Sequence, residues 1–102
     1  MFPSPSIDFI RSFVTVVRLG GFIRASKALG LSQPTVSLQV KRLEELLGTP
    51  LFENCSRLTL TTAGKSCFEY GSELVSNCDE MMQKNAELNQ AGVSGDRTLI
   101  RA

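Results

Sequence analysis

Residues 29–48 read LGLSQPTVSLQVKRLEELLG, and this stretch decides the fold of the chain. Ser32 is suited to cap a helix at its start, and Pro34 in the first turn would lose no helical hydrogen bond. The pattern predicts a helix over residues 33–47 that ends at Gly48. Four apolar residues recur in it at the i, i+4, i+7 and i+11 spacing of a buried helical stripe: Val36, Val40, Leu43 and Leu47.

The opposite face of this predicted helix carries groups that suit DNA. Hydroxyl and amide groups there can pair with base edges in a major groove, and cations can bind phosphate or guanine. Leu38 can press on a thymine methyl. A plain amphipathic helix with a solvated face is the alternative interpretation. The residues on this face are Gln33, Thr35, Ser37, Leu38, Lys41 and Arg42.

Two shorter helical patterns precede the 33–47 helix. Residues 7–19 place apolar side chains at helical spacing, and a glycine pair then stops the pattern. Residues 22–29 predict a short helix, and residues 30–32 predict a tight turn. Two helices joined by such a turn, the second with a polar outer face, are typical of a helix-turn-helix. Small or apolar residues in the short helix suit close packing: Ala25, Ala28 and Leu29.

A small hairpin is predicted directly after the helix-turn-helix. Residues 51–53 and 58–60 are short strand-like runs, and the polar residues 54–57 between them predict a turn. Arg57 lies at the tip, where a wing can place a cation on the DNA backbone or in the minor groove. An inert hairpin that only closes the core is the alternative.

The run GGFIRASKALGLSQPTVSLQVKRLEELLGTPLFE at residues 20–53, followed by LTTAG at 60–64, resembles the N-terminal domain of LysR-type bacterial transcriptional regulators. The resemblance covers roughly residues 7–91. It implies a mainly α fold, a winged helix-turn-helix followed by a long linker helix, and sequence-specific binding of double-stranded DNA. It implies groove-edge or phosphate contacts for Lys41 and the wing. It also implies DNA contacts for Gln33, Pro34, Thr35, Ser37 and Leu38.

Three positions depart from the usual pattern of that family. Leu38 stands where many members have arginine, Asn54 replaces a common arginine, and Ile23 replaces a frequent phosphate-binding Ser or Thr. The wing is also one residue shorter than is typical. The resemblance therefore does not determine the operator sequence.

A long helix is predicted from about residue 62 to 91, with Thr61 as its N-cap. Thirty residues span about 45 Å, which is too long to be buried within so small a domain. A mostly apolar set of its residues alternates by four and three, and such a seam calls for a partner helix. The seam comprises Cys67, Gly71, Leu74, Cys78, Met81, Asn85 and Leu88, with Phe68, Val75 and Met82 beside it.

In the resembled family this linker helix pairs antiparallel in a homodimer, so that two reading heads meet an inverted repeat. The resemblance thus implies a homodimer, and it leaves open a tetramer of the full-length chain. Without a histidine or a flanking base, the cysteines of this helix are interpreted as interface residues rather than as redox or catalytic groups. The predicted dimer-interface residues are Cys67, Leu74, Cys78, Met81 and Leu88.

The expected organisation is a DNA-binding domain over residues 1–60, a dimerisation helix over 61–91 and a hinge over 92–102. Members of the resembled family continue from here into an effector-binding domain. RTLIRA at 97–102 is predicted to begin its first strand, so we expect either a truncated chain or a natural short form. A small-molecule inducer is expected to bind the absent domain, and no cofactor is expected in this fragment.

Composition narrows the function further. Residues 1–65 carry eight Lys or Arg against four acids, a net +4, whereas residues 66–102 carry three against six, a net −3. This asymmetry suggests that the first part faces a polyanion. Three cysteines, no histidine and no apolar run of 18 residues favour a cytoplasmic protein without a metal site or membrane span. No catalytic constellation is recognisable, so an enzyme is not expected. A protein-interaction module that no longer reads DNA is the alternative function.

Overall fold

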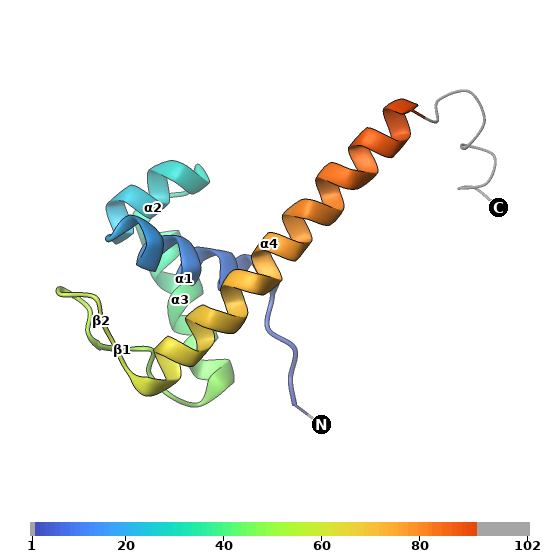
Figure 1. Ribbon diagram of the computed structural model, residues 1–102. Helices are drawn as coiled ribbons and strands as arrows, with labels where there is room; N and C mark the ends of the chain where they lie inside the picture. Colours follow the sequence, from blue (N-terminus) through green and yellow to red (C-terminus); the bar gives the residue numbers. More distant parts are fainter. Residues whose placement is uncertain (1, 92–102) are drawn as a thin grey trace.

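The computed structural model describes residues 2–91, so the predicted hinge and strand at 92–102 lie outside the described residues. The chain forms a mainly helical winged helix-turn-helix, which confirms the predicted fold (Figure 1). Three helices and a hairpin gather into a head, and the last helix runs along the head and beyond it. The elements are α1 (Ile7–Leu19), α2 (Phe22–Leu29), α3 (Gln33–Leu47), β1 (Phe52–Asn54), β2 (Thr59–Leu60) and α4 (Thr62–Ala91).

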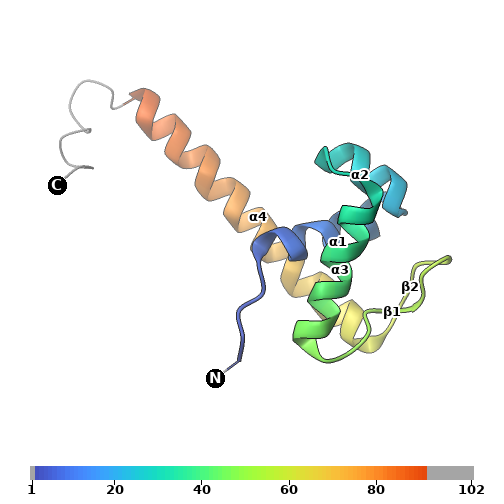
Figure 2. The ribbon, with the colours of Figure 1, turned by 180° about the vertical axis from the view of Figure 1, so that it is seen from behind.

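The core forms where α1 is covered by α3 on one side and by α4 on another (Figure 2). Phe13 of α1 is fully buried, and its ring meets that of Phe52 edge-on with the ring centroids 5.5 Å apart. Such an edge-to-face pair adds stability beyond the area it buries. The buried apolar residues are Ile10, Phe13, Val14, Val16, Ala25, Val36, Val40, Leu43, Leu51, Phe52 and Val75.

The helix ends follow the predicted chemistry. The Ser32 hydroxyl caps α3 by accepting a hydrogen bond from the backbone N–H of Thr35 at 3.2 Å. Glycines with positive φ end the first three helices, and Gly48, at φ 73°, ends α3. This left-handed conformation is costly for a side chain with a Cβ but not for glycine.

Two predicted core positions are wrong. Leu47 was expected to complete the buried stripe of α3, yet it is 45% exposed. The last turn of α3 borders an open apolar groove of about 350 Å³, where Leu47 lies with Tyr70 and Leu74. Ala28 of α2 is exposed. The buried polar position of α2 is instead Ser26, which can be buried because its hydroxyl donates to the backbone carbonyl of Ile23 at 2.7 Å.

The hairpin pairs β1 with β2 in antiparallel register, Phe52 opposite Leu60, with an irregularity between Phe52 and Asn54. The strands begin and end within a residue of the predicted runs. Asn54 shapes the tip, because its side-chain oxygen accepts hydrogen bonds from the backbone N–H groups of Ser56 (3.0 Å) and Arg57 (3.2 Å). An asparagine at this place thus closes the turn.

Helix α4 begins as predicted, with the Thr61 hydroxyl accepting from the backbone N–H of Gly64 at 2.9 Å. Its first turn lies so close to the start of the wing that a Cβ on Gly64 would stand 2.1 Å from the backbone oxygen of Leu51. Thr61 also donates to the backbone oxygen of Pro50 at 2.8 Å. The wing and α4 are therefore held together through backbone contacts.

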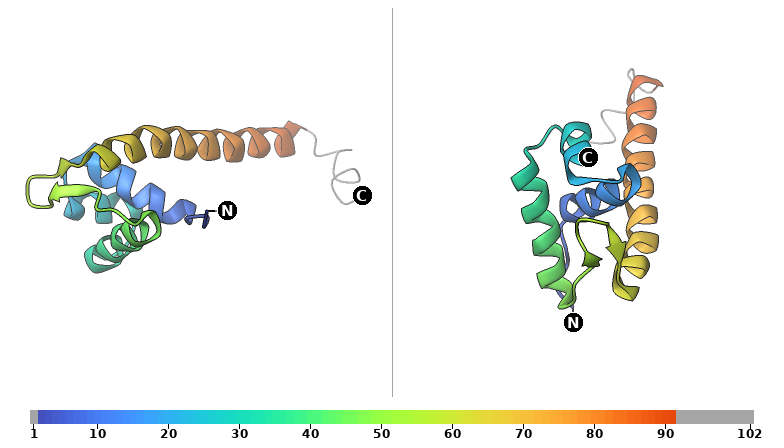
Figure 3. Two further views of the ribbon diagram at one scale, coloured as in Figure 1. Left: turned by 90° about the horizontal axis from the view of Figure 1, so that it is seen from below. Right: turned by 90° about the vertical axis from the view of Figure 1, so that its left-hand side faces the viewer.

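The first half of α4 packs on α1 of the same chain, which corrects the predicted seam. A Cβ on Gly71 would stand 2.9 Å from Ile10 Cγ2, and Val75 is 4% exposed. Gly71 of the seam and Val75 beside it have their partner inside the chain, because the small Gly71 lets the two helices approach closely. The side chains of residues 79–90 are all exposed, and Figure 3 shows this part of α4 continuing straight past the head. Between residues 2 and 91, none of the helices is both long and apolar enough to cross a membrane.

Candidate nucleic-acid interface

Polar side chains form one stripe along the exposed face of α3, toward the wing. Gln33, Ser37 and Lys41 are spaced four residues apart, so they lie on one side of the helix. We call them the polar stripe. All three are exposed, and they line an open groove of about 540 Å³ whose other wall includes Cys55 and Ser56 of the wing. The structure thus brings the predicted contact residues of α3 next to the wing.

A second stripe, of apolar side chains, runs beside the first. Pro34 and Leu38 are four residues apart and exposed, Leu38 by 51%. We call this pair the apolar stripe. The next position along it is Arg42, whose Nη1 lies 3.1 Å from a carboxylate oxygen of Glu45. Arg42 was predicted as a DNA contact, and its guanidinium already has an acidic partner in the chain.

Thr35 is less available than the sequence indicates. It is half-buried, and its hydroxyl lies 2.8 Å from that of the capping residue Ser32. The predicted wing residue Arg57 is exposed at the hairpin tip. The structure therefore brings Gln33 and the other residues of the two stripes to one surface, with Arg57 at its edge and Thr35 engaged in the helix cap.

Two side chains that hold α3 in place were missed as functional residues. The carboxylate of Glu44 accepts a hydrogen bond from the backbone N–H of Leu51 at 2.7 Å, which joins α3 to the start of the wing. The side-chain oxygen of Gln39 accepts a hydrogen bond from the Ser12 hydroxyl on α1. Because both bonds are partly shielded from water, they fix the orientation of the polar stripe against the head. Only the polar character of Gln39 and Glu44 within an otherwise amphipathic helix signals these contacts in the sequence.

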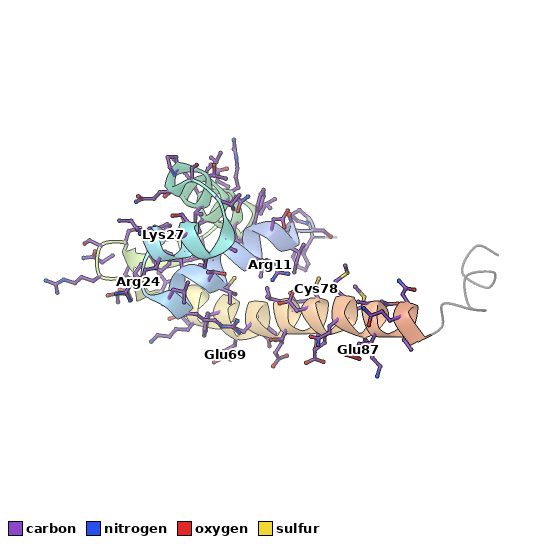
Figure 4. The ribbon with its side chains drawn as sticks, turned by 90° about the horizontal axis from the view of Figure 1, so that it is seen from above. Arg11, Arg24, Lys27, Glu69, Cys78 and Glu87 are labelled. Atoms are coloured by element: carbon purple, nitrogen blue, oxygen red, sulfur yellow. The ribbon has the colours of Figure 1, made fainter. Side chains whose placement is uncertain are left out.

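Two acidic residues of α4 lie on the edge turned away from the head, whereas Asp79 faces the head and pairs with Arg11 of α1. Figure 4 shows Glu69 and Glu87 on this edge, whereas Arg24 and Lys27 lie on the head. The charge asymmetry of the sequence is therefore also a separation in space. Negative charge on the outer edge of α4 and positive charge on the head favour approach of a polyanion to the head.

The five predicted dimer-interface residues divide by environment. Cys67 and Cys78 are half-buried. Figure 4 shows Cys78 on the side of α4 that faces Arg11 of α1. Burial raises the pKa of the Cys67 thiol, which favours its protonated, less reactive form. Leu74, Met81 and Leu88 form an exposed row at intervals of seven, each between 50% and 55% exposed.

Comparison with known proteins identifies the family. The bacterial regulatory helix-turn-helix proteins of the lysR family match residues 7–65. This chain belongs to the LysR family. The transcriptional regulator BudR of Klebsiella aerogenes is 46% identical over 79 residues, which make up 76% of this chain and 55% of BudR. This LysR-family chain spans about half of BudR and less than a third of other curated relatives that it matches.

Solved structures of LysR-type proteins share the fold. The BenM DNA-binding domain in complex with catB site 1 DNA superposes with a TM-score of 0.73 and 34% identity, covering 88% of this chain and 97% of that one. The H2O2-bound C206S mutant of Corynebacterium glutamicum OxyR superposes with a TM-score of 0.79 over 87% of this chain and 28% of that one. At 24% identity, OxyR supports the fold alone.

Proposed function

We propose that this chain binds specific double-stranded DNA as the reading head of a LysR-type transcriptional regulator, with the N-terminal half of α3 in the major groove. The observation that carries the proposal is the juxtaposition of the polar stripe with the wing across one groove. Amide and hydroxyl groups on Gln33 and Ser37 suit base edges, and Lys41 suits phosphate or guanine. The BenM domain, which shares this fold, was crystallised with DNA.

The regulator acts as a homodimer paired antiparallel through α4, so that two heads reach the two half-sites of an inverted repeat. The exposed row of Leu74, Met81 and Leu88 supports this part of the proposal, because such a row on a projecting helix is stabilised by a partner helix. A small-molecule inducer and a tetramer are further parts of this proposal, as the resemblance to the family implies. The activity is stoichiometric binding rather than catalysis, and it takes place in the cytoplasm on chromosomal DNA.

Selection of bound duplexes from a random-sequence DNA pool, at near-physiological salt, tests the proposal. We expect enrichment of an inverted repeat whose half-sites are separated by one helical turn or a multiple of it. An unenriched pool with a stable dimer in sedimentation would overturn the proposal and favour the interaction module. Enrichment of a single half-site would retain DNA reading and reject the dimeric arrangement.

The charge contribution can be separated with one lysine. Lys41→Ala should weaken binding to all sequences and reduce the slope of log K against log salt by about 1, because one phosphate contact is lost. Lys84→Ala is the matched control, since Lys84 lies on the exposed half of α4, and it should leave the slope unchanged. An unchanged slope in Lys41→Ala would show that this side chain does not contact phosphate.

A further inference from the structure

The apolar stripe of α3 presents carbon atoms where a DNA-reading helix ordinarily presents donors. Leu38 is 51% exposed on the second turn of α3, and the exposed ring of Pro34 lies one turn before it. Neither side chain can donate or accept a hydrogen bond. A half-exposed leucine beside an exposed proline therefore offers the major groove an apolar surface one turn long.

Two polar side chains next to this surface, Thr35 and Arg42, are engaged within the chain. The Thr35 hydroxyl lies 2.8 Å from the Ser32 hydroxyl in the helix cap, and the Arg42 guanidinium lies 3.1 Å from the Glu45 carboxylate. The polar stripe begins one residue earlier, about 100° around the helix, and faces the groove beside the wing. Leu38 thus meets the DNA without a competing donor at its own position.

We propose that the apolar stripe, through Leu38, reads the C5-methyl group of a pyrimidine, so that the base it accepts is a 5-methylpyrimidine, either thymine or 5-methylcytosine. This inference rests on the proposed function, because it requires α3 to enter the major groove. Thymine is the ordinary base with a methyl group in that groove, and it differs from 5-methylcytosine at the hydrogen-bonding atom of C4. An apolar side chain contacts the methyl group and does not distinguish the two atoms at C4.

Methylation of the DNA would act directly on this contact. Cytosine at the position under Leu38 should bind less well than thymine, and methylation of that cytosine should restore the contact. Removing one buried carbon group from water is worth about fourfold in an equilibrium constant, and this sets the expected effect per half-site. Cytosine methylation would thus strengthen binding at such a site.

The experiment uses the duplex enriched in the selection described above. Each thymine is replaced in turn by deoxyuridine, which lacks the methyl group and keeps the pairing edge. One position per half-site should lose about fourfold in affinity with the wild-type chain and should lose nothing with Leu38→Ala. A second duplex carries a cytosine in place of the thymine at that same position. Exchange of this cytosine for 5-methylcytosine should raise the affinity about fourfold with the wild type only.

Leu46→Ala is the matched control, because Leu46 is 38% exposed on the same side of α3, two turns farther from its N-terminus. It should keep both methyl effects. Equal affinity for thymine and deoxyuridine duplexes at every position, or equal methyl effects in Leu38→Ala, would overturn the inference while leaving DNA reading intact. A pool without enrichment would remove the proposed function and this inference together.

Discussion

The two halves of α4 carry one continuous heptad pattern but have different surroundings. From Thr62 to Asp79 the helix is packed against the head, with Val75 buried and Gly71 in close contact with α1. From Glu80 onward every described side chain is exposed. The apolar spacing therefore serves two purposes: Gly71 and Val75 pack within the chain, whereas Leu74 in the first half and Met81 and Leu88 in the second are left exposed.

This difference shows that a heptad pattern indicates a need for burial and not the identity of the partner. The first half finds its partner in α1, since α1 has apolar side chains left over after α3 has covered one side of it. The second half has no partner among residues 2–91, and a second copy of the chain is the one we propose. Five predictions, ordered from the largest effect to the smallest, test this division.

Gly64→Ala should produce the largest effect, because it attacks the first turn of the packed half. The new Cβ would stand 2.1 Å from the backbone oxygen of Leu51, so the wing or α4 must move. We expect the free energy of unfolding to fall by about 3 kcal/mol in urea titrations followed by circular dichroism. Gln83→Ala, in the exposed half, is the control and should change it by less than about 0.5 kcal/mol.

Gly71→Ala refines this prediction. Its Cβ would meet methyl groups of two buried β-branched side chains, Ile10 at 2.9 Å and Val14 at 3.1 Å, and both contacts are longer than the 2.1 Å contact with a backbone oxygen at Gly64. Its cost should therefore be smaller than that of Gly64→Ala. A reversed order would mean that contact with α1, and not the junction with the wing, holds the first half of α4.

Leu88→Asp should act on association and leave the head intact. Leu88 is 55% exposed in the single chain, so the substitution should hardly change its unfolding. In a paired seam it would bury a charge and raise the dimer dissociation constant by about 30-fold, or roughly 2 kcal/mol. Sedimentation equilibrium measures this constant. Gln83→Glu adds the same charge off the seam and should keep the dimer; a Leu88→Asp protein that dimerises normally would place the interface elsewhere.

Local chemistry made much of the fold predictable. Helix α3 was predicted from Gln33 to Leu47 and is found there, because Ser32, Pro34 and Gly48 specify its ends within a few residues. The Thr61 cap and the hairpin were predictable for the same reason. Arg42 could also have been paired with Glu45 in advance, since residues three apart meet on a helix.

Contacts between distant residues could not be predicted in this way. The bond from Leu51 N–H to Glu44 and that from Ser12 to Gln39 depend on how whole elements pack, which periodicity does not specify. The exposure of Leu47 has the same origin, because the apolar spacing of α3 continues past the point where α1 covers this helix. The candidate site could be predicted as a face of α3, but not as a groove shared with the wing.

The cysteines give a smaller effect that distinguishes the two halves of α4. Cys67 is half-buried in the packed half, and burial raises the pKa of its thiol, so at pH 8 it should react with a thiol reagent on the order of tenfold more slowly than the exposed Cys55. Cys78 lies where the two halves meet. If α4 pairs, Cys78 should react faster in Leu88→Asp than in the wild type, while Cys67 should react equally in both. Mass spectrometry of labelled peptides gives the three rates. Equal rates for Cys78 in the wild type and in Leu88→Asp would argue against pairing of α4 near Cys78.

The Arg11–Asp79 pair should give the smallest effect, because it is exposed at the end of the packed half. Arg11 Nη2 lies 2.9 Å from an Asp79 carboxylate oxygen, and its side chain donates a second bond at 3.2 Å. This hydrogen-bonded guanidinium lowers the pKa of Asp79 below its usual value.

A carboxyl group whose pKa is lower in the folded state stabilises the fold above its unfolded pKa, and the stabilisation is lost as the pH falls through the folded pKa. The melting temperature of Asp79→Asn should therefore lie slightly below that of the wild type at pH 5 to 7, and the difference should close as the pH drops below about 3.9. Glu80→Gln, one residue into the exposed half, should show no such trend, since Glu80 forms no ion pair within residues 2–91. If the difference in melting temperature between Asp79→Asn and the wild type stayed constant across this pH range, the contact between α4 and the head at this point would be held by packing and not by the ion pair.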